Sequence, residues 1–354
     1  MRITRHRAHA RAGLIGNPSD GYGGKTIAFA IRQFSAEVVM YPWDQLEIIW
    51  SDQDKNRFDS VDDLVTDVNL NGYYGGVRLV KATVKRFVEF CRQEDLELHD
   101  QPFSVRYHTN IPRGVGLAGS SAIVVATLRC LLDFYAIPIS LPLQASLARS
   151  VENDELNIAC GYQDRVAQVY EGLVCMDFSL MHPQAGLAFG RYEALDSSRL
   201  AQVYIAYDLA ASKSSGSVHG PLRTRLRNNS ELTDTMAEIA DLTPQARLAI
   251  EQGCTNSLHM LIDQNFDLRC QLYDIQPELR AIVNAARAIG ASAKFAGSGG
   301  AIVGTYENDT MYEKLARSLH AASPNWRVLR PHLVPSAELL VSKRTAPTET
   351  TQRS

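Results

Sequence analysis

The sequence predicts an α+β fold in two halves, and three observations support this prediction. Segments that alternate apolar and polar residues, as half-buried strands do, interleave with segments whose apolar residues recur at helical spacing. A short glycine-rich turn within 292–306 joins two strand-like segments as in a hairpin, which argues against a doubly wound parallel sheet. Long polar-faced helices become common after about residue 196. We therefore predict an N-terminal half at 1–195, a C-terminal half at 196–342 and a disordered tail at 343–354.

The N-terminal half opens with a basic segment that we expect to run into a first strand. A mitochondrial transit peptide is the alternative, but a motif-bearing turn follows at once. Further half-buried strands are expected at 36–41, 46–50 and 103–108. Helices are expected at 75–93, where the apolar residues share one face, at 121–135, where they surround the helix and predict burial, and at 141–156.

The C-terminal half begins with a predicted strand at 202–209, followed by helices to about residue 288. The remaining elements are two short strands within 292–306, a helix at 308–322 capped by Asn308 or Asp309, and a last strand at 326–334.

Composition and charge favour a globular protein that acts on a small molecule. The chain has 354 residues, of which 45% are hydrophobic and 21% charged, enough to build a core. Its net charge of -3 gives no electrostatic reason to expect nucleic acid or an anionic membrane as a partner. No apolar run approaches the roughly 18 residues of a membrane span. The six scattered cysteines predict reduced thiols in a cytoplasmic protein. We expect a monomer or a homodimer, a choice that the sequence leaves open.

The segment PRGVGLAGSSA (112–122) places Gly114, Gly116 and Gly119 in the spacing G-x-G-x-x-G. A dinucleotide site with this spacing needs an acidic residue about 20 positions further on, at the end of the next strand. The sequence there is YAIPISLPLQ, with two prolines and no carboxylate. An NAD-dependent oxidoreductase is therefore the weaker interpretation.

The same loop suits phosphate groups better. Its glycines allow a ligand to approach the backbone, and Ser120 and Ser121 open an apolar helix whose first N–H groups and dipole favour an anion. The paired serines can cap this helix and offer a hydroxyl to Mg²⁺. A serine cap alone would not need so many small residues, so the loop predicts phosphate binding.

Two further glycine-rich turns carry chemistry. The turn GNPSDGYGGKT (16–26) ends in G-K-T, but Ser19 stands where a P-loop needs its first glycine, and a strand-like run follows. We reject a P-loop and retain Asp20 and Lys25 as candidates for binding sugar hydroxyls or a carboxylate, with plain turn chemistry as the alternative. In KFAGSGGAIVG (294–304) the dense glycines suggest that a ligand approaches the backbone closely, although a simple hairpin is possible.

A candidate base lies within 151–178. Asp164 follows Gly161 in what reads as a turn entering a short helix, and Glu152 stands 12 residues earlier. One carboxylate of such a pair could hold Mg²⁺ while the other takes a proton from a hydroxyl. Acidic residues on a solvated helix surface are the simpler alternative.

Together these segments resemble the GHMP small-molecule kinases, which include galactokinases, homoserine kinases and mevalonate kinases. RAGLIGNPSD (11–20) is similar to the first motif as galactokinases have it, and PRGVGLAGSSA to the second, with one additional residue in G-L-A-G-S-S. KFAGSGGAIVG is similar to the third, with Ala296 in place of threonine. The resemblance implies a ribosomal-protein-type βαβ N-terminal half, a ferredoxin-like C-terminal half and an active site between them.

The resemblance implies where ATP and Mg²⁺ bind. The phosphates would be wrapped by Pro112, Gly114, Gly116, Leu117, Ala118, Gly119, Ser120 and Ser121. Ser121 and Glu152 would ligate Mg²⁺, with Glu155 as the alternative carboxylate.

It also implies which residues act on the substrate. Asp164 would take the proton from the sugar hydroxyl, while Arg11 would keep that aspartate ionised or stabilise charge in the transition state. Asp20 would bind sugar hydroxyls. The third motif would close over the phosphates or the substrate through Gly297, Gly299 and Gly300.

Within the family the chain most resembles the plant-type glucuronokinases, in GNPSDGYGGKTIA, IPRGVGLAGSSAIV and QDRVAQVYEGLVCMDF. This implies phosphorylation of the anomeric hydroxyl of D-glucuronate. A pocket for a sugar acid should contain an additional cation, for which Lys25 and Arg223 are candidates. The alternatives are a GHMP kinase acting on galactose, arabinose or a heptose, and a non-catalytic relative that binds sugar and ATP.

Overall fold

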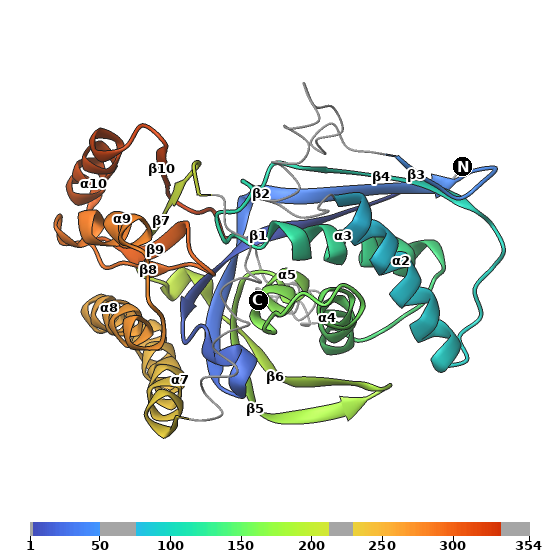
Figure 1. Ribbon diagram of the computed structural model, residues 1–354, viewed down its shortest axis with the longest axis horizontal. Coiled ribbons are helices and arrows are strands. Elements are labelled where there is room, and N and C mark those ends of the chain that lie inside the picture. Colours follow the sequence, from blue (N-terminus) through green and yellow to red (C-terminus); the bar gives the residue numbers. More distant parts are fainter. Residues whose placement is uncertain (1–2, 50–75, 212–228, 334–354) are drawn as a thin grey trace, which may run out of the picture.

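The structure of the chain is a computed structural model that describes residues 3–49, 76–211 and 229–333 (Figure 1). Strands and helices interleave as the predicted α+β class requires. The predicted tail at 343–354 and the candidate Arg223 lie outside the described residues.

The N-terminal half is built on one mixed sheet. β1 (Thr4–Ile15) pairs antiparallel with β2 (Lys25–Pro42), which also pairs with β4 (Phe103–Thr109) and β5 (Leu173–Gln184). With β3 (Glu47–Ile49) and β6 (Leu187–Leu195) at the edges, the order is β3-β4-β2-β5-β6, and β1 lies beside β2. The basic start therefore enters a first strand, as predicted. β2 is much longer than the predicted 36–41 because residues 26–31 are buried on both faces and do not alternate.

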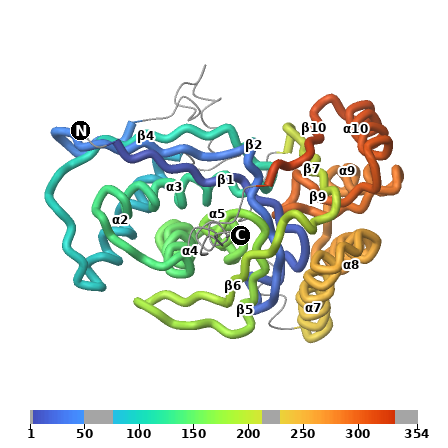
Figure 2. The backbone as a smooth tube through the Cα atoms, turned by 180° about the vertical axis from the view of Figure 1, so that it is seen from behind, coloured from blue at the N-terminus to red at the C-terminus, as the bar shows by residue number. Residues whose placement is uncertain are grey.

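Helices fill the space between the long strands and the β5–β6 hairpin (Figures 1 and 2). They are α2 (Gly76–Gln93), α3 (Gly119–Phe134), α4 (Leu141–Ser150) and α5 (Gln163–Tyr170). α2 and the buried α3 confirm two predicted helices. The helix predicted at 141–156 ends earlier, because its last residues form a separate π-helical turn, η2 (Val151–Glu155). Such turns occur frequently at functional sites, and this one contains Glu152.

The C-terminal half is an antiparallel sheet with helices. Its strands are β7 (Val203–Asp208), β8 (Lys294–Phe295), β9 (Ala301–Thr305) and β10 (Trp326–Leu329), in the order β10-β7-β9-β8. This is the strand order of a ferredoxin-like fold, as predicted. The helices are α7 (Ser230–Gln252), α8 (Thr255–Leu272), α9 (Pro277–Arg287) and α10 (Asp309–Ala322). Asn308 caps α10 by accepting a hydrogen bond from the Met311 N–H.

The two halves meet where β1 passes β8 and the loop that follows it. The Gly13 N–H donates to the Ala296 carbonyl at 2.8 Å, and the buried Lys294 Nζ donates to the Gly13 carbonyl at 2.8 Å. The chain also returns to the first sheet near its end, since the Arg32 N–H donates to the His332 carbonyl at 2.8 Å. The domain limits at 195/196 and 342/343 stay a prediction.

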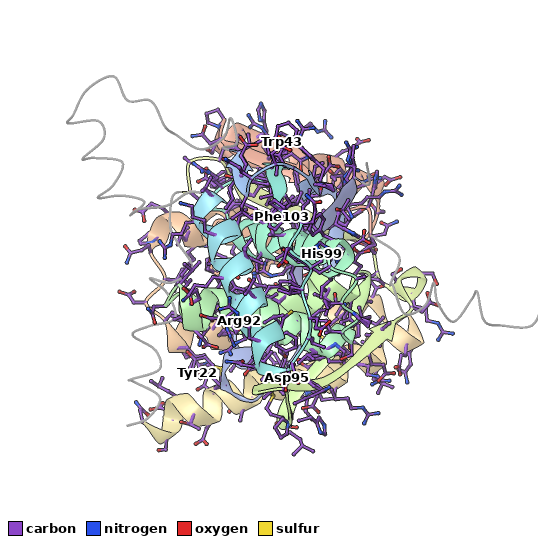
Figure 3. All side chains as sticks on the ribbon, turned by 90° about the vertical axis from the view of Figure 1, so that its right-hand side faces the viewer. Tyr22, Trp43, Arg92, Asp95, His99 and Phe103 are labelled. Carbon is purple, nitrogen blue, oxygen red and sulfur yellow. The ribbon has the colours of Figure 1, made fainter. Side chains whose placement is uncertain are left out.

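The opposite end of the N-terminal half faces the viewer in Figure 3, where Trp43, His99 and Phe103 are labelled. His99 and Phe103 pack with Phe134 and Tyr135 in an aromatic cluster. This cluster closes the far end of the core and contains none of the predicted site residues, which gather at the junction of the two halves.

Candidate active site

Arg11 joins the three motifs at one point. Its Nε donates to Asp164 Oδ1 at 2.7 Å, and its Nη1 donates to the carbonyls of Gly116 at 2.7 Å and Ala296 at 3.2 Å. The Arg11 side chain is only 5% exposed on β1, whereas Asp164, in the first turn of α5, is 24% exposed. The guanidinium therefore lies beneath the carboxylate and leaves it accessible.

A small cavity lies above this pair. The first-motif turn, the start of α5 and the third-motif loop line it, and Asp20, Asp164 and Gly297 are among its lining residues. Its volume of about 40 Å³ is close to that of one water molecule, about 30 Å³. The cavity is partly open to solvent, and residues 17, 18 and 20 of the first-motif turn and residues 297 and 298 of the third-motif loop line it.

Asp20 is buried at the edge of this cavity and is held by the backbone of α5. Its Oδ2 accepts hydrogen bonds from the N–H groups of Tyr162 at 2.8 Å and Gln163 at 3.0 Å. Gly161 permits this approach, because a Cβ there would lie 1.9 Å from the same oxygen. Burial raises the pKa of Asp20, and the two N–H bonds only partly oppose this effect.

The second-motif loop ends in a left-handed residue. Ala118 has φ 63° and ψ 43° and precedes α3 directly, so the additional residue of G-L-A-G-S-S is accommodated by one backbone conformation. The prediction that the serines cap α3 is wrong, because the helix already begins at Gly119 and Ala118 occupies the cap position. Both serines lie in the first turn, and Ser121 Oγ donates to the Ala118 carbonyl at 3.2 Å.

The second and third motifs touch through their backbones. A Cβ at Gly297 would lie 2.2 Å from the Gly116 carbonyl oxygen, and a Cβ at Gly116 would lie 2.6 Å from the Gly299 carbonyl oxygen. Gly300 has φ 83° and packs against Val115. The third-motif loop therefore covers the middle of the predicted phosphate loop, and side chains at these positions would separate the two.

Glu152 is buried in η2 and pairs with an arginine that the sequence analysis missed. Arg165 Nε donates to Glu152 Oε2 at 2.8 Å, and Arg165 Nη2 contacts the same oxygen. Burial raises the pKa of Glu152, although the Arg165 charge opposes this. The alternative ligand Glu155 is engaged elsewhere, since both of its oxygens accept from Lys85 at 2.6–2.7 Å.

Lys25 lies apart from this cluster. It pairs with Asp177 at 3.3 Å and lines a second, larger cavity of about 670 Å³ together with Met236 and Asp241. The two cavities share no lining residue. The structure therefore does not bring Lys25 to Asp20 and Asp164.

Two further buried cations near the site were missed by the sequence analysis. Lys294 donates to the carbonyls of Gly13 and Phe295 and also contacts Asn17 Oδ1. Burial, together with the nearby charges of Arg269 and Arg11, holds the pKa of Lys294 well below its ordinary value. Arg269 lines the small cavity from α8. The sequence did contain a signal for both: Lys294 is a basic residue beside small and apolar residues in a strand, and Arg269 is a basic residue on the apolar face of a helix.

A glycine-rich loop at a helix start and a carboxylate, both bound by one buried guanidinium where the two halves meet, are compatible with a small-molecule kinase. The family model of the GHMP kinases N terminal domain matches residues 78–172, and that of the GHMP kinases C terminal matches residues 246–325. None of the helices in the described part of the chain has the length and apolar character of a membrane span.

Two plant proteins are similar over most of the chain. Probable glucuronokinase 2 of Arabidopsis thaliana is 43% identical over 85% of this chain and 84% of its own length. Glucuronokinase 1 of the same plant is 42% identical over 84% of this chain and 83% of its own length.

Solved structures share the fold. Lactococcus lactis galactokinase complexed with galactose has a TM-score of 0.72 at 15% identity and covers 94% of both chains. Methanococcus jannaschii mevalonate kinase has a TM-score of 0.67 at 18% identity, covering 94% of this chain and 99% of its own. The chain belongs to the GHMP kinase family. It is a phosphotransferase that acts on a sugar hydroxyl and takes the phosphoryl group from ATP.

Proposed function

We propose that the enzyme phosphorylates D-glucuronate at its anomeric hydroxyl, giving glucuronate 1-phosphate and ADP. The observation that carries the proposal is the pairing of Asp164 with Arg11 beside Asp20, in a chain whose similar relatives include two named glucuronokinases. The resemblance in the first and second motifs supports the same substrate.

Asp164 is the proposed base. Its carboxylate accepts the proton of the C1 hydroxyl as that oxygen bonds to the γ-phosphorus of ATP, and the bond from the γ-phosphorus to the bridging oxygen of ADP breaks. Arg11 holds Oδ1 of the base at 2.7 Å and Arg165 Nη1 lies 3.7 Å from Oδ2, so the carboxylate is fixed between two guanidinium groups at the cavity. Both backbone hydrogen bonds to Asp20 go to its Oδ2. Its Oδ1 is therefore the oxygen that we propose accepts a hydrogen bond from a sugar hydroxyl.

The phosphates of ATP are proposed to bind against residues 112–121, where the first N–H groups of α3 and the positive end of its dipole favour anions. Mg²⁺ would be held by Ser121 and Glu152, and it supplies charge neutralisation on the phosphates. The donor set fits, because a hydroxyl and a carboxylate are oxygen ligands and both Arg165 contacts go to Oε2 of Glu152, which leaves Oε1 for the metal.

The metal ligands have a test that does not depend on turnover. An ATP analogue with Mg²⁺ should stabilise the protein in a thermal melt, whereas NAD should not. Glu152→Gln and Ser121→Ala should raise the Mg²⁺ concentration that this stabilisation requires. An unchanged Mg²⁺ requirement in both variants would assign the metal to other ligands.

We further propose a cytoplasmic protein that is a monomer or a homodimer. All six cysteines lie within the described residues and are free thiols, which supports a reducing compartment.

The proposed reaction is tested by measuring ADP release with Mg-ATP across glucuronate, glucose, galactose, arabinose and a heptose. Glucuronate should give the highest kcat/KM, and phosphorus NMR of the product should place the phosphate on C1. A higher kcat/KM for a neutral sugar would replace the substrate while the kinase assignment stands.

A further inference from the structure

We propose that Arg269 binds the carboxylate of the sugar acid and thereby sets the preference for a uronate over a neutral sugar. The proposal rests on the proposed function, and it names the residue that recognises the substrate. Lys25 lines the other cavity, and Arg223 lies outside the described residues.

Arg269 lies beside the proposed base. It is 2% exposed, lines the small cavity, and its Nη1 donates to the Gly297 carbonyl at 2.9 Å. Arg11, which holds Asp164, donates to the carbonyl of the preceding residue, Ala296. The two guanidinium groups therefore hold consecutive carbonyls of one loop, and both line the cavity that contains the proposed base.

This position matches the chemistry of a hexuronate ring. The anomeric carbon and the carbon that bears the carboxylate are the two neighbours of the ring oxygen. A group that binds the carboxylate must therefore lie close to the base that contacts the anomeric hydroxyl. Arg269 meets this requirement, because it shares the small cavity with Asp164.

Arg269 forms no ion pair within the described residues, although the Asp20 carboxylate is near enough to oppose the lowering of its pKa. Of the other arginines that line the cavity, Arg11 pairs with Asp164 and Arg165 pairs with Glu152. No carboxylate of the described residues lies within 4.0 Å of Arg269, whose contacts are two loop carbonyls and the rings of Tyr273 and Phe295. Burial accordingly lowers its pKa. A buried cation without an anion is costly, and a bound carboxylate would remove that cost.

Unused polar atoms at the cavity also indicate a ligand. Arg269 Nε is buried without a hydrogen-bond partner, and so is Gln163 Oε1, which belongs to another residue lining the same cavity. Nearly all buried polar groups in proteins have partners, and both residues line one cavity, so a ligand that reached these two atoms would complete their hydrogen bonding. The donor on Arg269 suits a carboxylate oxygen, and the acceptor on Gln163 suits a sugar hydroxyl.

The test compares glucuronate with its neutral isostere glucuronamide, in wild type and in Arg269→Gln. Wild type should strongly prefer glucuronate. In Arg269→Gln, kcat/KM for glucuronate should fall by roughly 30-fold or more, the usual effect of removing one partner of a buried charge pair, while kcat/KM for glucuronamide changes by less than about threefold. Loss of a purely structural arginine would lower both values equally.

Arg287→Gln is the matched control. This arginine packs on the Phe266 ring, but Asp263 and Asp267 already neutralise its charge, so its loss should leave the ratio of the two substrates unchanged. If Arg269→Gln is too unstable to assay, Arg269→Lys should raise the KM for glucuronate about tenfold or more and spare glucuronamide.

The outcomes separate the two proposals. A wild-type enzyme that prefers glucuronate, together with an Arg269 variant that keeps the full preference, overturns the role of Arg269 alone. Loss of the preference in Lys25→Gln instead would transfer the role to Lys25. A wild-type enzyme that ignores glucuronate overturns the proposed function and the role of Arg269 with it.

Discussion

At the scale of single residues, Asp164 carries the proposed proton transfer. Asp164→Asn keeps the size of the side chain and an oxygen that can accept from Arg11 Nε, but it removes the base. We expect kcat to fall by about 10² to 10⁴, the usual contribution of a positioned acid–base group, with ATP affinity near that of wild type. Steady-state kinetics and ATP titration measure the two effects. Asp309→Asn, an exposed carboxylate on α10, is the control and should change neither. Normal turnover in Asp164→Asn would place the base elsewhere.

The burial of Asp20 leads to a prediction about folding stability. Because burial raises its pKa, the folded protein holds this proton more tightly than the unfolded chain, so folding stability falls as pH rises through the folded pKa. Asp20→Asn keeps an oxygen for the Tyr162 and Gln163 N–H groups and removes the buried charge. We expect its free energy of unfolding near neutral pH to rise by about 0.5–2 kcal/mol, while the KM for the sugar increases.

Urea unfolding at two pH values checks this prediction. The stability gain of Asp20→Asn should be present at neutral pH and should vanish below about pH 3, where the carboxylate is protonated in both states. A variant that is less stable than wild type at neutral pH would mean that the charge of Asp20 is compensated in the fold.

Which site residues the sequence reveals depends on whether they belong to a recognisable motif. Arg11, Asp20 and Asp164 were predicted, because motifs mark them, and the structure brings all three together. Arg269 was missed because it lies within a long helix, where a charged residue ordinarily faces solvent. Its spacing carried the information, since the buried face of α8 includes Leu258, Ile262, Asn265, Arg269 and Leu272. A polar residue at a helix position that the apolar spacing assigns to the core therefore indicates a candidate site residue.

At the scale of elements, the sequence predicts the strands and helices better than their ends. The π-helical turn after α4 was read as continuous helix, because its residues include neither a glycine nor a proline that would mark a helix end. The left-handed Ala118 was not foreseen, because only the contact of the loop with its neighbours selects this conformation for an alanine. Local pattern determines the type of element, whereas packing determines where it begins and ends.

The contact between the second-motif and third-motif loops yields a prediction. In Gly297→Ala the new methyl group would lie 2.2 Å from the Gly116 carbonyl oxygen and 2.9 Å from Arg11 Nη1. The loops must separate, so we expect a loss of about 1–3 kcal/mol in the free energy of unfolding, as for overpacking, and weaker ATP binding. Gly119→Ala is the control, because its Cβ would lie 3.5 Å from Ile111, an ordinary contact, and stability should change by less than about 0.5 kcal/mol. Equal stabilities of the two variants, measured by urea unfolding, would contradict the packing argument.

At the scale of the whole molecule, the two halves are joined by buried hydrogen bonds at the site itself. Besides Lys294, the fully buried Asn265 of α8 bridges them, because its Oδ1 accepts from the Gly16 N–H at 2.8 Å and its Nδ2 donates to the Asn17 carbonyl at 3.2 Å. The same turn carries Asp20. Contacts that hold the halves together and contacts that shape the sugar site are therefore largely the same, and stability and substrate binding should respond together.

This arrangement predicts how the molecule unfolds. Trp43, beside the end of β2, and Trp326, on β10, each report on one half when the other tryptophans are replaced by phenylalanine. In the wild-type background the two fluorescence midpoints in urea should coincide, as for a cooperative unit. Asn265→Ala leaves two buried backbone groups without partners, each costing about 1–3 kcal/mol, and both losses fall on the junction. We therefore expect the two midpoints to separate.

The control is another Asn→Ala substitution, placed within the C-terminal half and away from the junction. Asn308→Ala removes only the cap of α10 and should cost about 1 kcal/mol. Because the junction is intact in this variant, both midpoints should shift together. Coincident midpoints in Asn265→Ala would show that the remaining bonds, chiefly those of Lys294 and Arg11 to the backbone of the opposite half, are sufficient to couple the halves. Separated midpoints already in the wild-type background would show that the junction does not couple the unfolding of the two halves.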